Sequence, residues 1–332
     1  MALRGMSHFP PPPPLPPKVG LFHRVPPAVF PPIFGLLGLG VAWRQAVDVF
    51  SLNGAIVEAA LGAVTLLFFY CLVAYGTKAF LRVGAVREDL RTLPGRTGLC
   101  AIALAMMLEA LVLAPYAPGL ATALLFCGFA GLAVIAVVVL AGRIAGKDPS
   151  GPPTPAMHLV FVGFIVAVLP ASALSVATPL LPYVVWYAVF ASFAVAAWTL
   201  GGLIAGTAPP PLRPLQTIHL APPALISTGA LLTGQTMLAE IALGVAAVLF
   251  LFLLGRLRWM MATGFSGFWS AFTFPVAGFA GALLGVAHWE PARIAGGVVL
   301  VAATLYVPVI AYKVLKLWAK GVLAVKTNAS IA

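Results

Sequence analysis

Charged residues are scarce in this chain of 332 residues: they make up 8% of it, whereas hydrophobic residues make up 62%. A soluble globular domain carries about 25% charged and about 45–50% apolar residues, so this composition excludes one. The sequence also contains no His-Glu-x-x-His, no paired aspartate motif and no Gly-x-Ser-x-Gly. Because such patterns carry zinc-protease and serine-hydrolase chemistry, we predict that the protein is not an enzyme.

Cysteines and acidic residues are few as well. Cys71, Cys100 and Cys127 lie inside apolar stretches, without the spacing of a disulfide framework or a metal site, so we expect no metal and no cofactor. Eight Asp and Glu stand against 19 Lys and Arg, which gives a formal net charge of +11. The basic residues fall in short breaks between apolar runs, so this surplus indicates membrane topology and argues against a nucleic-acid partner.

Apolar runs of membrane-spanning length dominate the rest of the chain. A helix needs about 20 residues to cross a bilayer, and ten runs meet this length. Several connections are so short that neighbouring helices must be antiparallel. The sequence therefore predicts an all-α membrane protein in a lipid bilayer, with ten transmembrane helices at residues 28–49, 54–77, 97–116, 118–142, 157–177, 180–204, 215–234, 238–256, 267–288 and 294–317.

Lysine and arginine are concentrated at alternate connections. One side of the membrane receives only Arg44 and Arg293, whereas the two ends of the chain and the even-numbered connections hold the other basic residues. Because such residues accumulate in cytoplasmic loops, we predict a multi-pass inner (plasma) membrane protein with both termini in the cytoplasm. Its expected regions are a disordered, proline-rich cytoplasmic tail (1–27), a ten-helix channel domain (28–317) and a cytoplasmic tail (318–332).

The leading tail has its own composition. The segment from Phe9 to Lys18 reads FPPPPPLPPK, which cannot be helical and favours extended polyproline II structure. We interpret it as a disordered spacer, with a docking motif as the alternative.

Proline distinguishes the odd-numbered predicted helices from the even-numbered ones. The first, fifth, seventh and ninth contain Pro31-Pro32, Pro170, Pro222-Pro223 and Pro275, whereas the second, fourth, sixth and eighth have no internal proline. Proline kinks a helix, and the backbone carbonyls that it frees must face protein or water in a membrane. We therefore predict five helical hairpins in a quasi-fivefold arrangement, with kinked odd helices around a central pore. The third helix, which lacks proline, and the tenth, which has Pro308, depart from this pattern.

The ninth predicted helix presents one face that is bare except for a phenyl ring. Gly267, Ala271, Phe274, Gly278 and Gly281 are spaced by 4, 3, 4 and 3 residues, which places them on one side of a helix. This face suits either tight packing through small residues or a smooth pore wall with one aromatic plug. The predicted pore-lining residues, from the first, fifth, seventh and ninth helices, are Gly35, Gly38, Gly163, Pro170, Pro222, Pro223, Gly267, Ala271, Gly278 and Gly281.

Three segments carry a family resemblance: residues 34–44 (FGLLGLGVAWR), 218–225 (IHLAPPAL) and 267–275 (GFWSAFTFP). In this order they resemble signatures of the TehA family of tellurite-resistance and C4-dicarboxylate transporters, which includes the plant slow-type guard-cell anion channels. The resemblance implies a ten-helix, quasi-fivefold fold and a homotrimer with one pore in each protomer. It also implies that Phe274 is the gate. Pro275 replaces a glycine of some relatives, and residues 159–164 are apolar where relatives have asparagine.

Two transport functions remain open at this point. We favour an anion channel for small inorganic or organic anions, because the centres of the odd helices contain no Lys or Arg that would trap an anion. The alternative is a proton-coupled carrier of C4-dicarboxylates or other organic anions or oxyanions, which needs a protonatable site such as Glu109 or His219. Both residues are candidates for regulation or the ion pathway, against structural roles. For Arg44, a helix-end salt bridge, with Glu109 as one candidate partner, or an interfacial anchor is favoured over anion binding.

Overall fold

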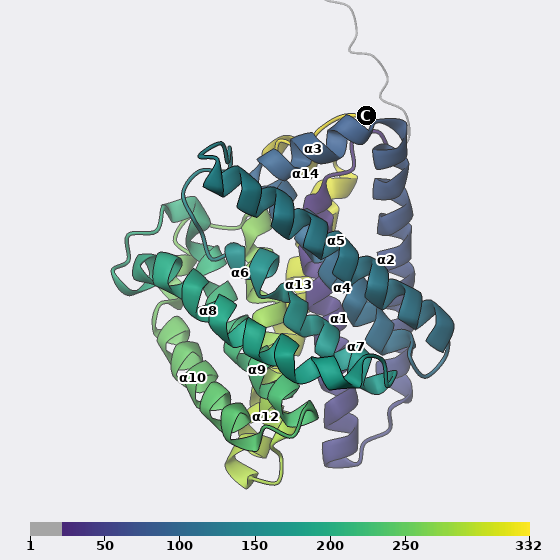
Figure 1. Ribbon diagram of the computed structural model, residues 1–332, viewed down its shortest axis with the longest axis vertical. Helices are drawn as coiled ribbons and strands as arrows, with labels where there is room; N and C mark the ends of the chain where they lie inside the picture. Colours follow the sequence, from purple (N-terminus) through teal and green to yellow (C-terminus); the bar gives the residue numbers. More distant parts are fainter. Residues whose placement is uncertain (1–21) are drawn as a thin grey trace, which may run out of the picture.

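The computed structural model describes residues 22–332, and the proline-rich stretch 9–18 lies outside them. The described part of the chain consists of helices and their connections, without strands (Figure 1). Eight of its helices are long and apolar enough to cross a membrane. The protein is therefore an all-helical, multi-pass membrane protein, as predicted.

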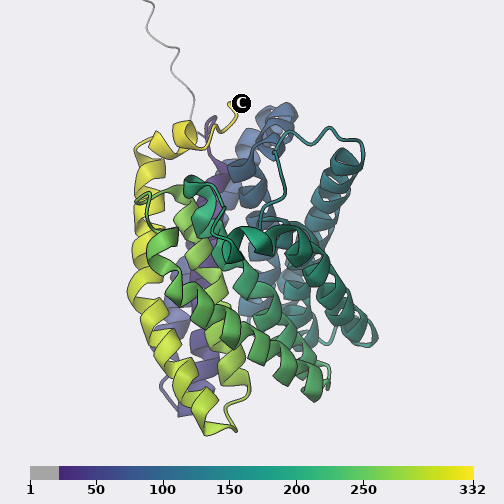
Figure 2. The ribbon, with the colours of Figure 1, turned by 90° about the vertical axis from the view of Figure 1, so that its left-hand side faces the viewer.

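Long, uninterrupted helices form the outer part of the molecule. Helix α2 follows the first connection of the chain. Helix α13 runs along the full height of one side of the molecule (Figure 2). Each outer helix is largely apolar, as expected of a lipid-facing element. The outer helices are α2 (Ala55–Leu81), α5 (Pro118–Ile144), α8 (Leu181–Ile204), α10 (Thr236–Gly255) and α13 (Glu290–Ala319).

The inner part comprises five segments, and four of them change helix type along their length. Each contacts the next in chain order, and α12 contacts α1, so the ring of contacts closes. The inner segments are η1 (Pro27–Val29) with α1 (Phe30–Phe50); α4 (Leu93–Leu113); α6 (Met157–Phe161), η2 (Gly163–Ala167) and α7 (Val168–Ala173); η4 (Pro210–Leu220) with α9 (Ala221–Leu232); and η5 (Gly267–Phe272) with α12 (Phe274–Gly285). The remaining short helices are α3 (Val83–Arg91), η3 (Thr178–Leu180), α11 (Leu257–Met260) and α14 (Val322–Lys326).

Burial separates the two groups as the proline pattern predicted. In the most apolar stretch of each element, 44% of α1, 78% of α4 and 67% of η5–α12 is buried, against 17–39% of the five outer helices. Helix α4 has no internal break, so burial of the inner segments does not depend on a kink. The predicted spans 157–177 and 215–234 are not single long helices, because each changes between α and 3₁₀ geometry.

In three of the four segments that change helix type, the α-helix begins where the sequence places proline. Helices α1, α9 and α12 each begin just before a proline, at Phe30, Ala221 and Phe274, and a 3₁₀ segment precedes each one. Proline suits the first turn of an α-helix, because the N–H that it lacks has no acceptor there. Its ring would clash with an α-helical preceding turn, so that turn adopts the tighter 3₁₀ winding. The expected interruption at these prolines is confirmed.

Both described ends of the chain lie on the same side of the molecule (Figure 1). The backbone N–H of Ala332 donates to the carbonyl of His23 at 2.9 Å, and helix α14 folds back so that Leu323 is buried. Ser330 donates its backbone N–H to Asp89, which forms a fully buried ion pair with Lys78 at 2.8 Å. Most basic residues lie on this side, which we call the basic side.

A second ion cluster ties the connection after α5 to α4 on the basic side. Asp148 lies 2.7 Å from the Arg96 guanidinium and 2.6 Å from that of Arg143, and it accepts the backbone N–H of Ser150 at 3.0 Å. Burial raises the pKa of Asp148, but the hydrogen bonds from Arg96 and Ser150 outweigh burial and hold this pKa below its ordinary value. The carboxylate is therefore charged at neutral pH.

Candidate functional site

Three cavities follow one another along the centre of the inner ring, and all five inner segments line each of them. The basic-side cavity has a volume of about 310 Å³. The middle cavity, of about 30 Å³, shares Phe34 and Ile218 with it. The far cavity, of about 40 Å³, shares Val166 and Leu225 with the middle cavity. The shared residues place the three cavities in series.

Phe274 is the one residue that lines all three cavities. It begins α12, and its ring stacks on that of Phe34 in α1, with 3.8 Å between the ring centroids and an interplanar angle of 20°. A Cβ added to Gly38 would lie 2.6 Å from Cδ2 of this ring, so only glycine leaves room for it. The ring is 6% exposed and fills the space between the basic-side and far cavities.

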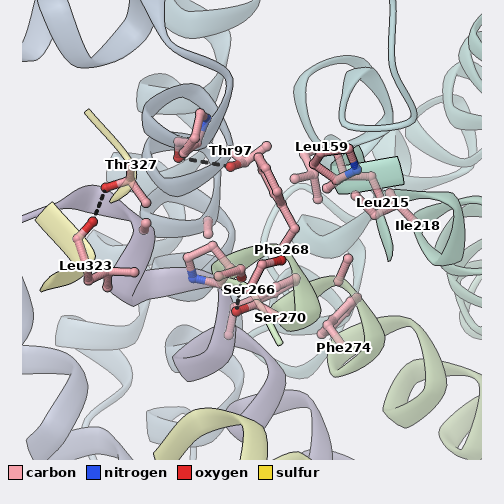
Figure 3. Close-up of a pocket in the computed structure, with 18 of the residues that line it drawn as sticks. Thr97, Leu159, Leu215, Ile218, Ser266, Phe268, Ser270, Phe274, Leu323 and Thr327 are labelled. Atoms are coloured by element: carbon pink, nitrogen blue, oxygen red, sulfur yellow. Dashed lines mark hydrogen bonds between the residues drawn. The ribbon is translucent and has the colours of Figure 1, made fainter. Parts of the chain in front are cut away.

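The lining of the basic-side cavity holds few groups that could bind an anion tightly. The hydroxyls of Thr97, Ser270 and Thr327 donate to backbone carbonyls of their own segments at 2.8–2.9 Å (Figure 3). Within residues 22–332, Lys326 is the one charged side chain in the lining. The cavity is thus weakly positive and mostly apolar.

Polar groups of a different kind line the far cavity. The Gln45 amide, in the orientation that satisfies both of its polar atoms, donates to the Gly281 carbonyl at 2.9 Å and accepts the Gly285 N–H at 3.0 Å. Thr228 donates to the Ala224 carbonyl at 3.2 Å. The two Gln45 bonds connect α1 to α12 at the far cavity, which Phe274 also borders.

Residues 24–315 match the family model described as voltage-dependent anion channel, SLAC1. The chain belongs to this family. The resemblance to TehA-like proteins and plant slow anion channels is therefore confirmed. No curated protein matches the chain.

Most of the pore-lining residues predicted for this SLAC1-family chain border a cavity. Gly267 and Ala271 line the basic-side cavity, and Gly163 and Pro222 line the middle cavity. The far cavity is lined by Gly38, Gly278 and Gly281. The other three lie elsewhere. Gly35 contacts Thr273 between α1 and α12, Pro170 is buried in α7, and Pro223 faces an outer groove between α8 and α10.

Arg44 and Glu109 lie away from the three cavities. Arg44 forms the helix-end salt bridge that the sequence favoured, but its partner is Glu58, with both contacts at 2.6 Å. The suggested pairing with Glu109 is wrong, because Glu109 is buried against α2, where it accepts a hydrogen bond from Thr65 at 3.1 Å. Glu58 follows Arg44 across one hairpin turn, which brings the two side chains together.

The third candidate, His219, is buried beside His158, with 3.0 Å between their ring nitrogens. His158 lines the middle cavity, and both rings face the outer groove between α8 and α10. His219 therefore lies one side chain away from the central axis.

Sequence reasoning missed three residues of the SLAC1-family site: Phe34, Gln45 and Lys326. Phe34 belongs to a segment that carries the family resemblance, so its position was a usable signal. Gln45 lies seven residues after Gly38 on the same face of α1, so helical spacing was a usable signal for it as well. No local pattern distinguishes Lys326, because it reaches the axis only through packing of distant segments.

Proposed function

We propose that this protein is an anion channel in which small anions pass along the three central cavities, and that Phe274 is the gate. The observation that carries the proposal is the position of the Phe274 ring, which borders every cavity and separates the largest from the far one. A hydrophobic constriction of this kind can block ion passage. Membership of the SLAC1 voltage-dependent anion channel family supports the choice of anions.

The electrostatics of the axis suit anions. No Asp or Glu among the described residues lines the three cavities, and Lys326 contributes a positive charge to the basic-side one. Attraction without a tight binding site permits both entry and release of an ion.

The architecture proposed for this function is five helical hairpins in a quasi-fivefold arrangement, with inner segments around the pathway. The closed ring of contacts supports it. We place the basic side in the cytoplasm of a plasma membrane, because Lys and Arg favour cytoplasmic loops. A homotrimer with one pathway in each protomer follows from the family resemblance.

A proton-coupled carrier of C4-dicarboxylates or other anions is the second candidate. Neither Glu109 nor His219 lines a central cavity, so the observation that favours a carrier is the titratable ring of His158 at the middle cavity. The two candidates differ in how chloride flux into proteoliposomes responds to an imposed proton gradient. The flux through a channel is independent of the gradient, whereas the flux through a proton-coupled carrier follows it.

Replacement of Phe274 tests the gate directly. We expect Phe274→Ala to raise chloride conductance in planar bilayers about tenfold or more, which corresponds to removal of about 1.4 kcal/mol from the barrier. Phe272→Ala is the matched control, because Phe272 faces an outer groove between α10 and α13 and lines none of the central cavities. Unchanged current in a folded Phe274→Ala protein, or equal increases in both variants, contradicts the proposal.

A further inference from the structure

An apolar groove of about 570 Å³ lies on the outer surface between α10 and α13. Both helices pack on α12, without an extensive contact between them, so the floor of the groove is formed by residues such as Phe272 and Val276. Its rim includes Leu254, Val298 and Val309, which are 49%, 65% and 48% exposed. In a multi-pass membrane protein, an exposed apolar surface at this level faces lipid acyl chains.

A cation marks the basic-side end of this groove. Lys313 of α13 lines it, with Nζ 5.3 Å from the centre of the Phe265 ring. No Asp or Glu lines the groove, and Lys313 has no ion-pair partner among residues 22–332. The acidic residue of α13, Glu290, is at the opposite end of this helix, about 35 Å away at 1.5 Å per residue. The positive charge of Lys313 is therefore available to an anion from outside the chain.

We propose that the groove between α10 and α13 binds an anionic phospholipid, with one acyl chain along the apolar floor and the phosphate at Lys313. The two halves of this ligand match the two halves of the site. The hydroxyl and indole donors in the lining, those of Thr217, Trp269 and Tyr306, all bond within the chain, so the mostly apolar floor suits a hydrocarbon chain. The unpaired ammonium at the membrane-surface end suits a phosphate. The proposal concerns lipid binding and does not depend on anion conduction.

Charge complementarity favours a lipid over a second copy of the chain. A second copy would need a free carboxylate at the level of Lys313. On the basic side, Glu88 is paired with Arg82, Asp89 with Lys78, and Asp148 with Arg96. Among residues 22–332, each Asp and Glu side chain on the basic side is thus paired, whereas an anionic lipid leaflet supplies phosphate at this depth.

Trp269 provides a reporter, because its indole lines the floor of the groove. The full-length protein is reconstituted in phosphatidylcholine vesicles that contain increasing fractions of phosphatidylglycerol, with bromine on the acyl chains of one lipid or the other. The emission that is lost in Trp269→Phe isolates the Trp269 signal from the other six tryptophans. Brominated chains in the groove quench this signal by contact.

We expect brominated phosphatidylglycerol to quench Trp269 about fivefold more effectively, per mole of lipid, than brominated phosphatidylcholine. This ratio corresponds to the attraction of about 1 kcal/mol between one lysine and an anionic lipid surface. Lys313→Gln is expected to remove this preference. Lys316→Gln is the matched control, because Lys316 lies over the Tyr312 ring one turn further on and does not line the groove. Both variants must elute and unfold as the parent protein does.

Three results overturn the proposal. Equal quenching of the parent protein by both brominated lipids shows no preference for the anionic headgroup. Equal loss of preference in Lys313→Gln and Lys316→Gln shows general surface attraction. Absence of Trp269 quenching by either lipid shows that protein, such as a second copy of the chain, fills the groove.

Discussion

Gly38→Ala perturbs the proposed gate without any change to the phenyl ring itself. The added Cβ would lie 2.6 Å from Cδ2 and 3.0 Å from Cε2 of Phe274, and ordinary contact begins at 3.4 Å. The ring must therefore move by about 0.8 Å or turn to another rotamer. It cannot shift toward Phe34, because that ring already stacks on it at 3.8 Å.

The size of the effect follows from this overlap. Overpacking in a well-packed interior costs typically about 1–3 kcal/mol. If the cost falls on the closed arrangement alone, the ratio of closed to open channels decreases by about 5- to 150-fold. We expect single-channel recording of chloride current in planar bilayers to show an increased open probability for Gly38→Ala.

Two further variants distinguish displacement of the Phe274 ring from other effects of an added methyl group. Gly278→Ala adds the same methyl group on the other side of the same ring, but its Cβ would lie 3.8 Å from Cε1, so we expect currents like those of the parent. In a Phe274→Ala background, Gly38→Ala has no ring to displace and is expected to add nothing. Parent-like currents in a folded Gly38→Ala protein, or an additional increase in the Phe274→Ala background, would refute this account of the gate.

Three other predictions concern the basic side. Asp89→Ala leaves Lys78 buried without its partner and is expected to cost about 3–5 kcal/mol in thermal or denaturant unfolding, whereas Glu88→Ala, which breaks the exposed pair with Arg82, is expected to change stability far less; equal losses contradict this. The pKa of Asp148 is lower in the folded state, so its stabilisation is complete above the unfolded pKa of about 4 and is lost as pH falls through the folded pKa. Asp148→Asn is therefore expected to lower stability at pH 7, with the difference from the parent protein decreasing below about pH 4, and a difference that grows in acid has the wrong sign. Lys326→Gln is expected to reduce chloride conductance about twofold at 10 mM salt and to have no effect at 1 M, where the Debye length is about 3 Å. Lys320→Gln is the control, because Lys320 does not line the basic-side cavity. An effect of Lys326→Gln that persists at 1 M salt contradicts a through-space electrostatic role.

Much of the inner and outer arrangement could be predicted because its causes are local. Pro222-Pro223 and Pro275 change the helix type of their own segments, and no distant contact alters this. The salt bridge of Arg44 was predictable in kind, but its partner was not. Glu58 lies across the first connection at the start of α2, so the geometry of that turn decides which carboxylate Arg44 meets.

The candidate site was predictable only in part, since the ninth helix pattern identifies Phe274 but not what its ring contacts. Phe34 lies 240 residues earlier in the chain, and the stacking of the two rings depends on how α1 packs on α12. Lys326 and Thr327 reach the basic-side cavity because α14 folds back over it, anchored through Ser330 to Asp89. A tail of this composition carries no local signal for such a position.

The sequence by itself determined that this is a membrane protein, its helical class and the points at which three of its inner segments change helix type, because hydropathy, length and proline act within one segment. Only the tertiary structure decided which residues meet at the axis, which carboxylate neutralises each buried cation, and where the outer helices separate to leave a groove. Those outcomes depend on contacts between segments far apart in the chain, and the free energy of such contacts resides in the assembled packing.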